Sequence, residues 1–275
     1  MKNYKDTIFS LEGKTALVVG GLGQIGANSA KILLDAGAEV EILDVVAESE
    51  SSRAQILREQ YKGNDLTFSK LDITSEKEVE DKISDSKNKF KKIDILINHA
   101  HFKGDPKLLK PHSEFFSSVE DYPFEVWKNT IDVNLNGLFL LTKAVGKCMK
   151  EQQSGVIVNT ASTYGLLSPN KSIYGDSGIN SPISYAVTKA AILNFSRYLA
   201  THWAEHNIRV NTISPGGVDN SAQSVEFKDA YSKLTPMGRL AADTEYQGAI
   251  LFLASNASSY MTGSNLVVDG GWTAW

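Results

Sequence analysis

The chain has little of what a membrane, secreted or nucleic-acid-binding protein needs. It contains one cysteine, Cys148, in 275 residues, so no disulfide forms within it and the fold does not depend on oxidation. No apolar run approaches the roughly 20 residues that span a bilayer. The charged N-terminus (residues 1–10) lacks the apolar core of a secretory signal. We therefore expect a cytoplasmic location and no membrane contact.

Basic charge and metal-ligand clusters are also scarce. The net charge is −4 and no block of Lys and Arg stands out, which argues against a nucleic-acid partner. His99 and His101 are close in sequence, but no third ligand stands at a recognisable spacing. We therefore expect no metal.

What the chain does contain is an alternation of two periods. Short β-branched runs alternate with segments whose apolar residues have helical spacing. The predicted strands are 15–19, 39–43, 66–71, 93–97, 156–159, 208–213 and 265–268, and the clearest helices are 76–90, 123–152 and 183–205. This order predicts an α/β fold, a doubly wound (Rossmann) parallel sheet of seven strands with helices on both faces. Seven strands use the whole length, so we expect one domain over residues 1–275.

A glycine-rich stretch follows the first predicted strand. Gly20, Gly23 and Gly26 stand there, with Gln24 and Ile25 among them, before a predicted helix. Glycines permit a tight turn and let the backbone approach a pyrophosphate at the helix N-terminus. The stretch alone also fits an ordinary strand–helix turn, but its position near the start of the fold favours a dinucleotide site.

Asp44 ends the second predicted strand, close to the ~20 residues beyond the glycines at which an acidic residue binds the ribose hydroxyls. A carboxylate there repels a 2′-phosphate, and residues 45–47 offer no cation to neutralise one. The pattern favours NAD(H) over NADP(H). The alternative is a surface aspartate that ends a strand.

Tyr185 and Lys189 lie four residues apart on a predicted helix, so they share one face. A phenol has a pKa near ~10 and is a poor base at neutral pH. A neighbouring ammonium lowers that pKa, and the pair then passes a proton to or from a carbonyl or alcohol oxygen. About one such pair arises by chance in a chain of this composition, so the pair has weight only beside a cofactor site.

With these motifs in order, the chain resembles the single-domain branch of the short-chain dehydrogenase/reductase family over essentially its whole length. The resemblance implies that Tyr185 is the general acid/base, that Lys189 lowers its pKa and holds the nicotinamide ribose, and that Ser162 binds the reacting oxygen. It implies that Asn134 orders a water that connects Lys189 to solvent. The alternative for Asn134 is a buried helix asparagine that caps a backbone kink, and the alternative for Ser162 is an ordinary loop serine. Further cofactor contacts implied by the family pattern are Asp72, Ile73, Asn98, Ala100, Pro215, Gly216 and Val218.

The chain also departs from the family pattern. Gln24 stands where the single-domain branch has glycine, and the resulting spacing is similar to that of the nucleotide-sugar epimerases and dehydratases, whose second domain this chain has no length for. His99 and His101 replace Asn and Gly, and we expect both near the cofactor and the substrate mouth. The family is usually homotetrameric, so we expect a homo-oligomer, a tetramer or dimer, formed through helices 123–152 and 183–205.

The main hypothesis is an NAD-dependent alcohol/carbonyl oxidoreductase. The alternatives are an epimerase or dehydratase that retains its NAD and a non-catalytic dinucleotide sensor, which would not need Ser162, Tyr185, Lys189 and Asn134 together. The loop 99–122 carries Lys103, Lys107, Lys110 and His112 against Asp105, and the insert 168–182 is rich in polar side chains such as Asn170, Lys171, Ser172, Tyr174, Asp176 and Asn180. A local positive rim can steer an anion. We therefore expect a polar, anionic sugar-like substrate; the alternative is a solvated loop.

Overall fold

The computed structural model describes residues 7–63, 65–102 and 114–275. They form a seven-stranded sheet in the order β3-β2-β1-β4-β5-β6-β7, and every neighbouring pair is parallel. The strands are β1 (Thr15–Val19), β2 (Glu39–Asp44), β3 (Leu66–Lys70), β4 (Ile95–Asn98), β5 (Gly155–Thr160), β6 (Ile208–Pro215) and β7 (Asn265–Val268). The predicted doubly wound sheet is confirmed.

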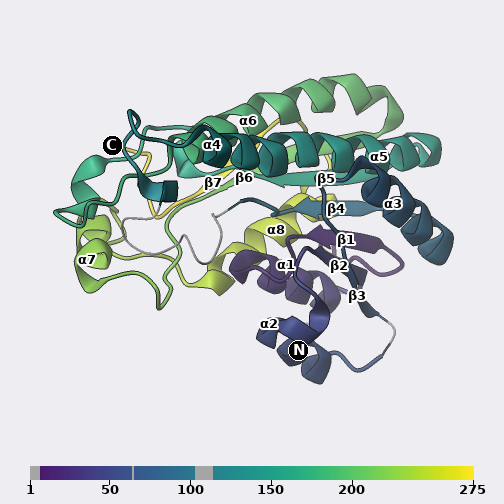
Figure 1. Cartoon of the computed structure of the whole chain (residues 1–275). Coiled ribbons are helices and arrows are strands. Elements are labelled where there is room, and N and C mark those ends of the chain that lie inside the picture. The colour runs from purple at the N-terminus through teal and green to yellow at the C-terminus, as the bar shows by residue number, and fades with distance from the viewer. Residues whose placement is uncertain (1–6, 64, 103–113) are drawn as a thin grey trace.

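Helices cover both faces of this sheet (Figure 1). One face carries α3 (Glu76–Phe90), α4 (Phe124–Ile131), α5 (Leu138–Gln152) and α6 (Ile183–Trp203). The other carries α1 (Gln24–Asp35) and α8 (Gln247–Ala254), with α2 (Ser52–Gln60) beside α1. The remaining helix, α7 (Val225–Lys233), packs against the short η5 helix (Lys171–Tyr174).

The two layers follow from the alternation of side chains along each strand. In β1, Ala16 and Val18 join the core shared with α1 and α8, whereas Leu17 and Val19 join the core shared with α3, α5 and α6. Both sets are buried. A strand buried on both faces has to be apolar throughout, which explains the continuous β-branched runs.

The helix predicted over residues 123–152 is interrupted. A π-helical segment, η3 (Asp132–Gly137), separates α4 from α5. A π turn adds one residue without breaking the helix, and apolar periodicity does not register so small a change. The strand predicted at 93–97 is also shorter, because both backbone polar groups of Ile93 pair with the Gln152 side chain instead. None of the described helices is long and apolar enough to cross a membrane.

Candidate active site

The predicted site residues gather at the carboxyl edge of the sheet, where parallel strands all end. The strand order reverses between β1 and β4, which places a crevice at this edge. Gly20 follows β1, His99 follows β4 and Ser162 lies two residues beyond β5. The Gly20 N–H donates to the Leu43 carbonyl (2.8 Å) and the His99 N–H donates to the Val19 carbonyl (2.8 Å), so the first residues after β1 and β4 are held by the ends of β2 and β1.

The glycine turn fits a pyrophosphate. Gly20 has a φ of +69°, and a Cβ there would lie 2.7 Å from the Ala100 nitrogen. A Cβ on Gly26 would lie 2.8 Å from Gly21 Cα, so α1 also needs glycine to pack on the turn. Gly23 is the N-cap of α1, so the helix has no capping side chain, and its first turn contains no acidic residue. Its first N–H groups thus point, uncapped by a side chain, to where an anion binds.

Asp44 lies at the end of β2 beside this turn. One carboxylate oxygen accepts from the Leu22 N–H (2.9 Å) and the other from the Val46 N–H (3.0 Å). A carboxylate has about four acceptor positions, so ribose hydroxyls still find acceptors on Asp44. Gln24 links the glycine turn to another part of the crevice, because its Nε2 donates to the carbonyl of Asp219 (2.8 Å) in the segment after β6.

Four more of the predicted cofactor residues lie in the loop after β3 and at the end of β4. The Asp72 carboxylate accepts from the N–H (2.9 Å) and hydroxyl (2.7 Å) of Thr74 and so orders its own loop. Ile73 is buried, and its side chain lies against Gly137 of the π segment. The Asn98 Oδ1 accepts from the Ala100 N–H (3.2 Å). These contacts hold the two loops at the crevice.

The predicted nicotinamide end lies after β6. Pro215 is the last residue of that strand, and the Gly216 N–H donates to the Val268 carbonyl (2.9 Å). Val218 pairs with Ala241 in an isolated parallel bridge, and it is partly exposed. The structure therefore places the three predicted residues at the end of β6 and in the loop after it, which is joined to the glycine turn through Gln24 and Asp219.

Ser162, Tyr185 and Lys189 are brought together from β5 and α6. The Lys189 Nζ is buried, donates to the Thr160 carbonyl (2.7 Å) and lies 5.6 Å from the centroid of the Tyr185 ring. The Ser162 side chain is hydrogen-bonded to the Tyr185 phenol, and its Oγ also accepts from the Tyr164 N–H (3.1 Å). The i, i+4 spacing has thus placed phenol and ammonium on one helix face, as predicted.

The pKa of Tyr185 moves in the opposite direction to the prediction. Burial raises this pKa, the hydrogen bond with Ser162 offsets part of the rise, and Tyr174 adds to it. The sequence predicts a pKa lowered by Lys189. That prediction is wrong here because loss of water around the phenol outweighs the favourable contacts, while the ammonium donates to the Thr160 carbonyl.

Asn134 lies in the π segment and is buried, but its side chain is already engaged. Its Oδ1 accepts from the Phe102 N–H (2.7 Å) and its Nδ2 donates to the Thr188 hydroxyl (3.0 Å). The amide therefore ties the segment after β4 to the residue next to Lys189. The expectation that Asn134 orders a water between Lys189 and solvent stays a prediction.

The two histidines after β4 have different environments. His101 lies at the site: its ring meets the Tyr185 ring edge-on at 6.1 Å between centroids, and its Nδ1 lies 3.0 Å from the His99 carbonyl. His99 does not face the substrate mouth. It is buried between the Ser29 and Thr160 hydroxyls, and burial, with Lys189 nearby, lowers its pKa to about 3. No group of three or more His, Cys, Asp or Glu suited to a metal occurs among the described residues.

Tyr164 is a site residue that the sequence analysis did not single out. It lies two residues beyond Ser162, in the η4 turn (Thr163–Gly165), and is hydrogen-bonded to Tyr174 of the insert. Burial raises its pKa, and Tyr174 and Tyr185 add to the rise, so these phenols are neighbours. Its place just after the predicted serine was the available signal.

The insert 168–182 is built differently from the expectation. The Asn170 Oδ1 accepts from the N–H (3.0 Å) and hydroxyl (2.8 Å) of Ser172, and the Asn180 Nδ2 donates to the Phe116 carbonyl (3.3 Å). Both amides are therefore used within the loops, and Tyr174 is the insert residue that contacts the site. The predicted positive rim, Lys103, Lys107, Lys110 and His112 with Asp105, lies outside the described residues.

Comparison with known proteins agrees with this geometry. A family model described as enoyl-(acyl carrier protein) reductase matches residues 22–273. The chain is 32% identical to the NAD-dependent glycerol dehydrogenase of Listeria innocua, over 98% of this chain and 97% of the relative. A short-chain dehydrogenase of Leptospira borgpetersenii solved with bound NAD⁺ has a TM-score of 0.84 at 36% identity, covering 99% of this chain and 96% of that one.

A second solved structure bears on the cofactor. The gluconate 5-dehydrogenase of Burkholderia cenocepacia, in complex with NADP and tartrate, has a TM-score of 0.83 at 28% identity and covers 97% of this chain and 98% of that one. Fold, crevice and relatives together define an oxidoreductase that uses a nicotinamide cofactor. More particularly, the chain belongs to the short-chain dehydrogenase/reductase family.

Proposed function

We propose that this protein is a one-domain, NAD(H)-dependent oxidoreductase that interconverts an alcohol and a carbonyl by hydride transfer. The observation that carries the proposal is the contact between Ser162, Tyr185 and Lys189 beside an uncapped glycine turn. The cofactor, when bound, supplies or accepts the hydride. The glycine turn holds its pyrophosphate and Asp44 its ribose.

The protein's own part in the reaction is to hold and move one proton. Burial keeps the Tyr185 phenol protonated, so in the reducing direction its hydroxyl donates the proton to the substrate's carbonyl oxygen. The Ser162 hydroxyl, already bonded to that phenol, binds the same oxygen. In the oxidising direction Tyr185 has to become a phenolate, and the Lys189 ammonium, 5.6 Å from the ring centroid, favours that charge.

Preference for NAD(H) rests on Asp44. Its negative charge stands at the end of β2, and the next two side chains, Val45 and Val46, are exposed and uncharged. Nothing in that turn neutralises a 2′-phosphate. The related glycerol dehydrogenase is named as NAD-dependent and the Leptospira structure contains NAD⁺, whereas the Burkholderia structure contains NADP, so both cofactors occur among the similar proteins.

For the substrate we propose a small, polyhydroxylated, anionic, sugar-like molecule. Glycerol and gluconate dehydrogenases are among the relatives. The described residues around Tyr185 include the polar rings of His101, Tyr164 and Tyr174. The epimerase or dehydratase alternative has only the glycine spacing in its favour. A panel of polyols, sugar acids and acyl or steroid ketones, followed by NADH absorbance, tests the class; preference for the last group would contradict it.

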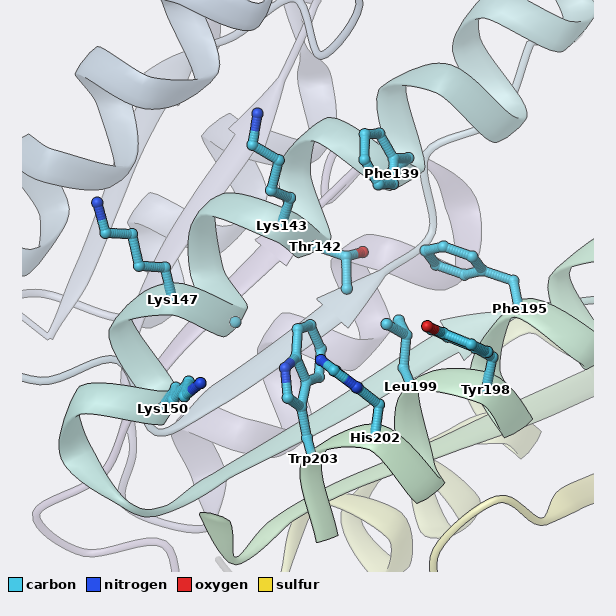
Figure 2. Close-up of a pocket in the computed structure, with 11 residues that line it drawn as sticks. Phe139, Thr142, Lys143, Lys147, Lys150, Phe195, Tyr198, Leu199, His202 and Trp203 are labelled. Carbon is cyan, nitrogen blue, oxygen red and sulfur yellow. The ribbon is translucent and has the colours of Figure 1, made fainter. Parts of the chain in front are cut away.

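We also propose that the enzyme is cytoplasmic and that it assembles with copies of itself. A groove of about 370 Å³ lies between α5 and α6. In Figure 2 the rings of α6 lie toward α5, while Lys143 and Lys147 project away from the groove. Phe139 (51% exposed) and Tyr198 (65% exposed) leave this face apolar. A twofold axis would bury such a face against the same face of a second copy.

The function is tested by Tyr185→Phe, which keeps the ring and removes only the oxygen that moves the proton. We expect turnover to fall ~10²–10⁴-fold, the range of general acid–base catalysis, with NAD(H) affinity nearly unchanged. Tyr260→Phe, at a fully exposed tyrosine, is the control and should behave as the wild type. Full activity in Tyr185→Phe would refute the mechanism.

A further inference from the structure

A continuous chain of hydrogen-bonding groups runs from the catalytic lysine to the cofactor helix. Lys189 Nζ lies 2.7 Å from the Thr160 carbonyl oxygen, and the hydroxyl of the same threonine lies 2.7 Å from His99 Nδ1. His99 Nε2 lies 2.8 Å from the Ser29 hydroxyl, and that hydroxyl lies 3.0 Å from the Ile25 carbonyl oxygen. Ile25 is the second residue of α1, so this series of hydrogen bonds ends in the first turn of the helix whose N-terminus would hold the pyrophosphate.

The number of available hydrogens fixes which group donates and which accepts in each of these hydrogen bonds. The Ile25 carbonyl can only accept, so the single hydroxyl hydrogen of Ser29 is directed to it. Ser29 then accepts from His99, which requires hydrogen on Nε2. The unprotonated Nδ1 in turn accepts the hydroxyl hydrogen of Thr160. One neutral tautomer of His99 therefore satisfies all of these contacts.

We propose that His99 is a positioning residue, fixed as its neutral Nε2–H tautomer, that holds Thr160 so that the Thr160 carbonyl places the Lys189 ammonium beside Tyr185. The inference rests on the proposed function, since it assigns a reason for the placement of Lys189. It also assigns a role to a residue that departs from the family pattern at this point of the chain.

Charge makes the neutral form necessary. A protonated His99 would place a second cation beside Lys189, and both side chains are buried and so shielded from water. Among the described residues, the titratable groups near these hydrogen bonds are Lys189 and Tyr185 on α6 and His101, which follows β4 as His99 does. An imidazole with nitrogens on opposite edges bridges two hydroxyls without adding charge, which a lysine or arginine cannot do.

The tautomer can be tested on the protein alone, without turnover. In ¹⁵N-histidine-labelled protein, long-range ¹H–¹⁵N correlation spectra distinguish the Nε2–H, Nδ1–H and doubly protonated rings. We expect the His99 signals to show the Nε2–H form with no titration from about pH 5 to 9, a window that contains the ordinary histidine pKa. An Nδ1–H form, or a protonation step within that window, would overturn the proposal. The His99→Asn spectrum assigns the signals.

Kinetics test the positioning role. His99→Asn cannot bridge both hydroxyls, and Thr160→Val removes one hydroxyl while keeping the side-chain shape and the carbonyl. For both we expect kcat to fall about ten- to a hundredfold, the loss that follows small misplacement of catalytic groups, with the substrate KM changed far less. The alkaline limb of the oxidation pH profile should move to higher pH, because a displaced ammonium favours the phenolate less. Thr160→Ser should restore most of the loss.

Controls separate this inference from packing and from the function itself. His206→Asn changes a histidine at the other end of β6 and should leave kcat and the pH limb unchanged. A lowered melting temperature with wild-type kcat and pH limb in both test variants would show that His99 only packs, and would overturn the proposal. Full activity in Lys189→Ala would instead refute the proposed function, while the tautomer result would stand.

Discussion

At the scale of single residues, Asp44 has two tasks that a substitution can separate. Its carboxylate accepts from the Leu22 N–H of the glycine turn. In the proposed mode of cofactor binding it also places a negative charge where a 2′-phosphate would lie. Asp44→Ala should weaken NAD(H) binding more than NADP(H) binding, so the difference in affinity between the two cofactors should become smaller. Asp44→Asn keeps one acceptor oxygen and loses the charge, so it isolates the electrostatic part. Fluorescence titration with both cofactors measures the effect; tighter NADPH than NADH binding by the wild type would contradict it.

The raised pKa of Tyr185 gives the reaction an asymmetric pH dependence. A raised pKa keeps the phenol protonated through neutral pH, so carbonyl reduction should be flat there and fall only at alkaline pH. Alcohol oxidation needs the phenolate, so its rate should rise with pH through roughly the range 7 to 10, up to the reference phenol pKa and beyond. Initial rates in both directions at matched saturation measure this. An oxidation rate that is flat over that range would show that the phenol titrates below it.

Which site residues were predictable depends on how local their signals are. Tyr185 and Lys189 share one helix face through their spacing, and the glycines of the turn stand after a strand, so sequence pattern alone brought them forward. The sequence analysis expected His99 at the substrate mouth, which is wrong, and it did not single out Tyr164. Their roles come from contacts with Ser29, Thr160 and Tyr174 across elements distant in sequence, which no local period encodes.

At the scale of elements, the strands followed the prediction closely because burial on both faces forces long β-branched runs. The helices were less predictable where a tertiary contact reshapes them. The π segment η3 turns Asn134 inward to reach Phe102 and Thr188. Gly137 at its end allows Ile73 to approach, since a Cβ there would lie 2.7 Å from the Ile73 Cγ1. These contacts between α4, α5 and the loop after β3 do not alter the spacing of apolar residues, so the sequence pattern does not predict them.

The contact between β2 and α3 contains a buried ion pair that supports the cofactor half of the sheet. Glu41 is 1% exposed, and Lys82 on α3 lies 2.7 Å from its carboxylate; Ser69 and Ser86 complete its hydrogen bonds. Lys82→Met should leave the carboxylate buried with fewer partners. We expect a loss of about 1–3 kcal/mol in the free energy of unfolding, measured by urea denaturation.

The pH dependence of that loss has a defined sign. Burial acts to raise the pKa of Glu41, but the bonds from Lys82, Ser86 and Ser69 outweigh it and hold the pKa below its ordinary value. A lowered pKa stabilises the folded protein above the unfolded value near ~4.3 and ceases to do so as pH falls through the folded value. The loss in the free energy of unfolding caused by Lys82→Met should therefore become smaller at acidic pH. Lys77→Met, which breaks an exposed pair with Asp81 on the same helix, should change little at any pH.

At the scale of the whole molecule, the chemistry and the apolar surface lie in different places. The strand ends and their loops carry the site, whereas the groove between α5 and α6 lies on the outer side of that helix layer (Figure 2). Trp203 closes the floor of the groove because Gly146 opposite it has no side chain. Since α6 also carries Tyr185 and Lys189, a partner that packs on its outer face would stiffen the helix that holds the proposed catalytic pair.

This arrangement predicts that a charge on the groove separates the copies. Phe139→Asp places a carboxylate in a face that a second copy would bury, and an unpaired buried charge is costly. Stable interfaces bury about 1,200–2,000 Å² in total, so one central charge should suffice. Analytical ultracentrifugation should show a wild-type assembly and a variant near the 30.0 kDa of one chain. Ile56→Asp, at a similarly exposed apolar residue on α2, should keep the wild-type mass. A monomeric wild type at micromolar concentration, or dissociation by Ile56→Asp but not by Phe139→Asp, would exclude α5 and α6 as the contact between copies.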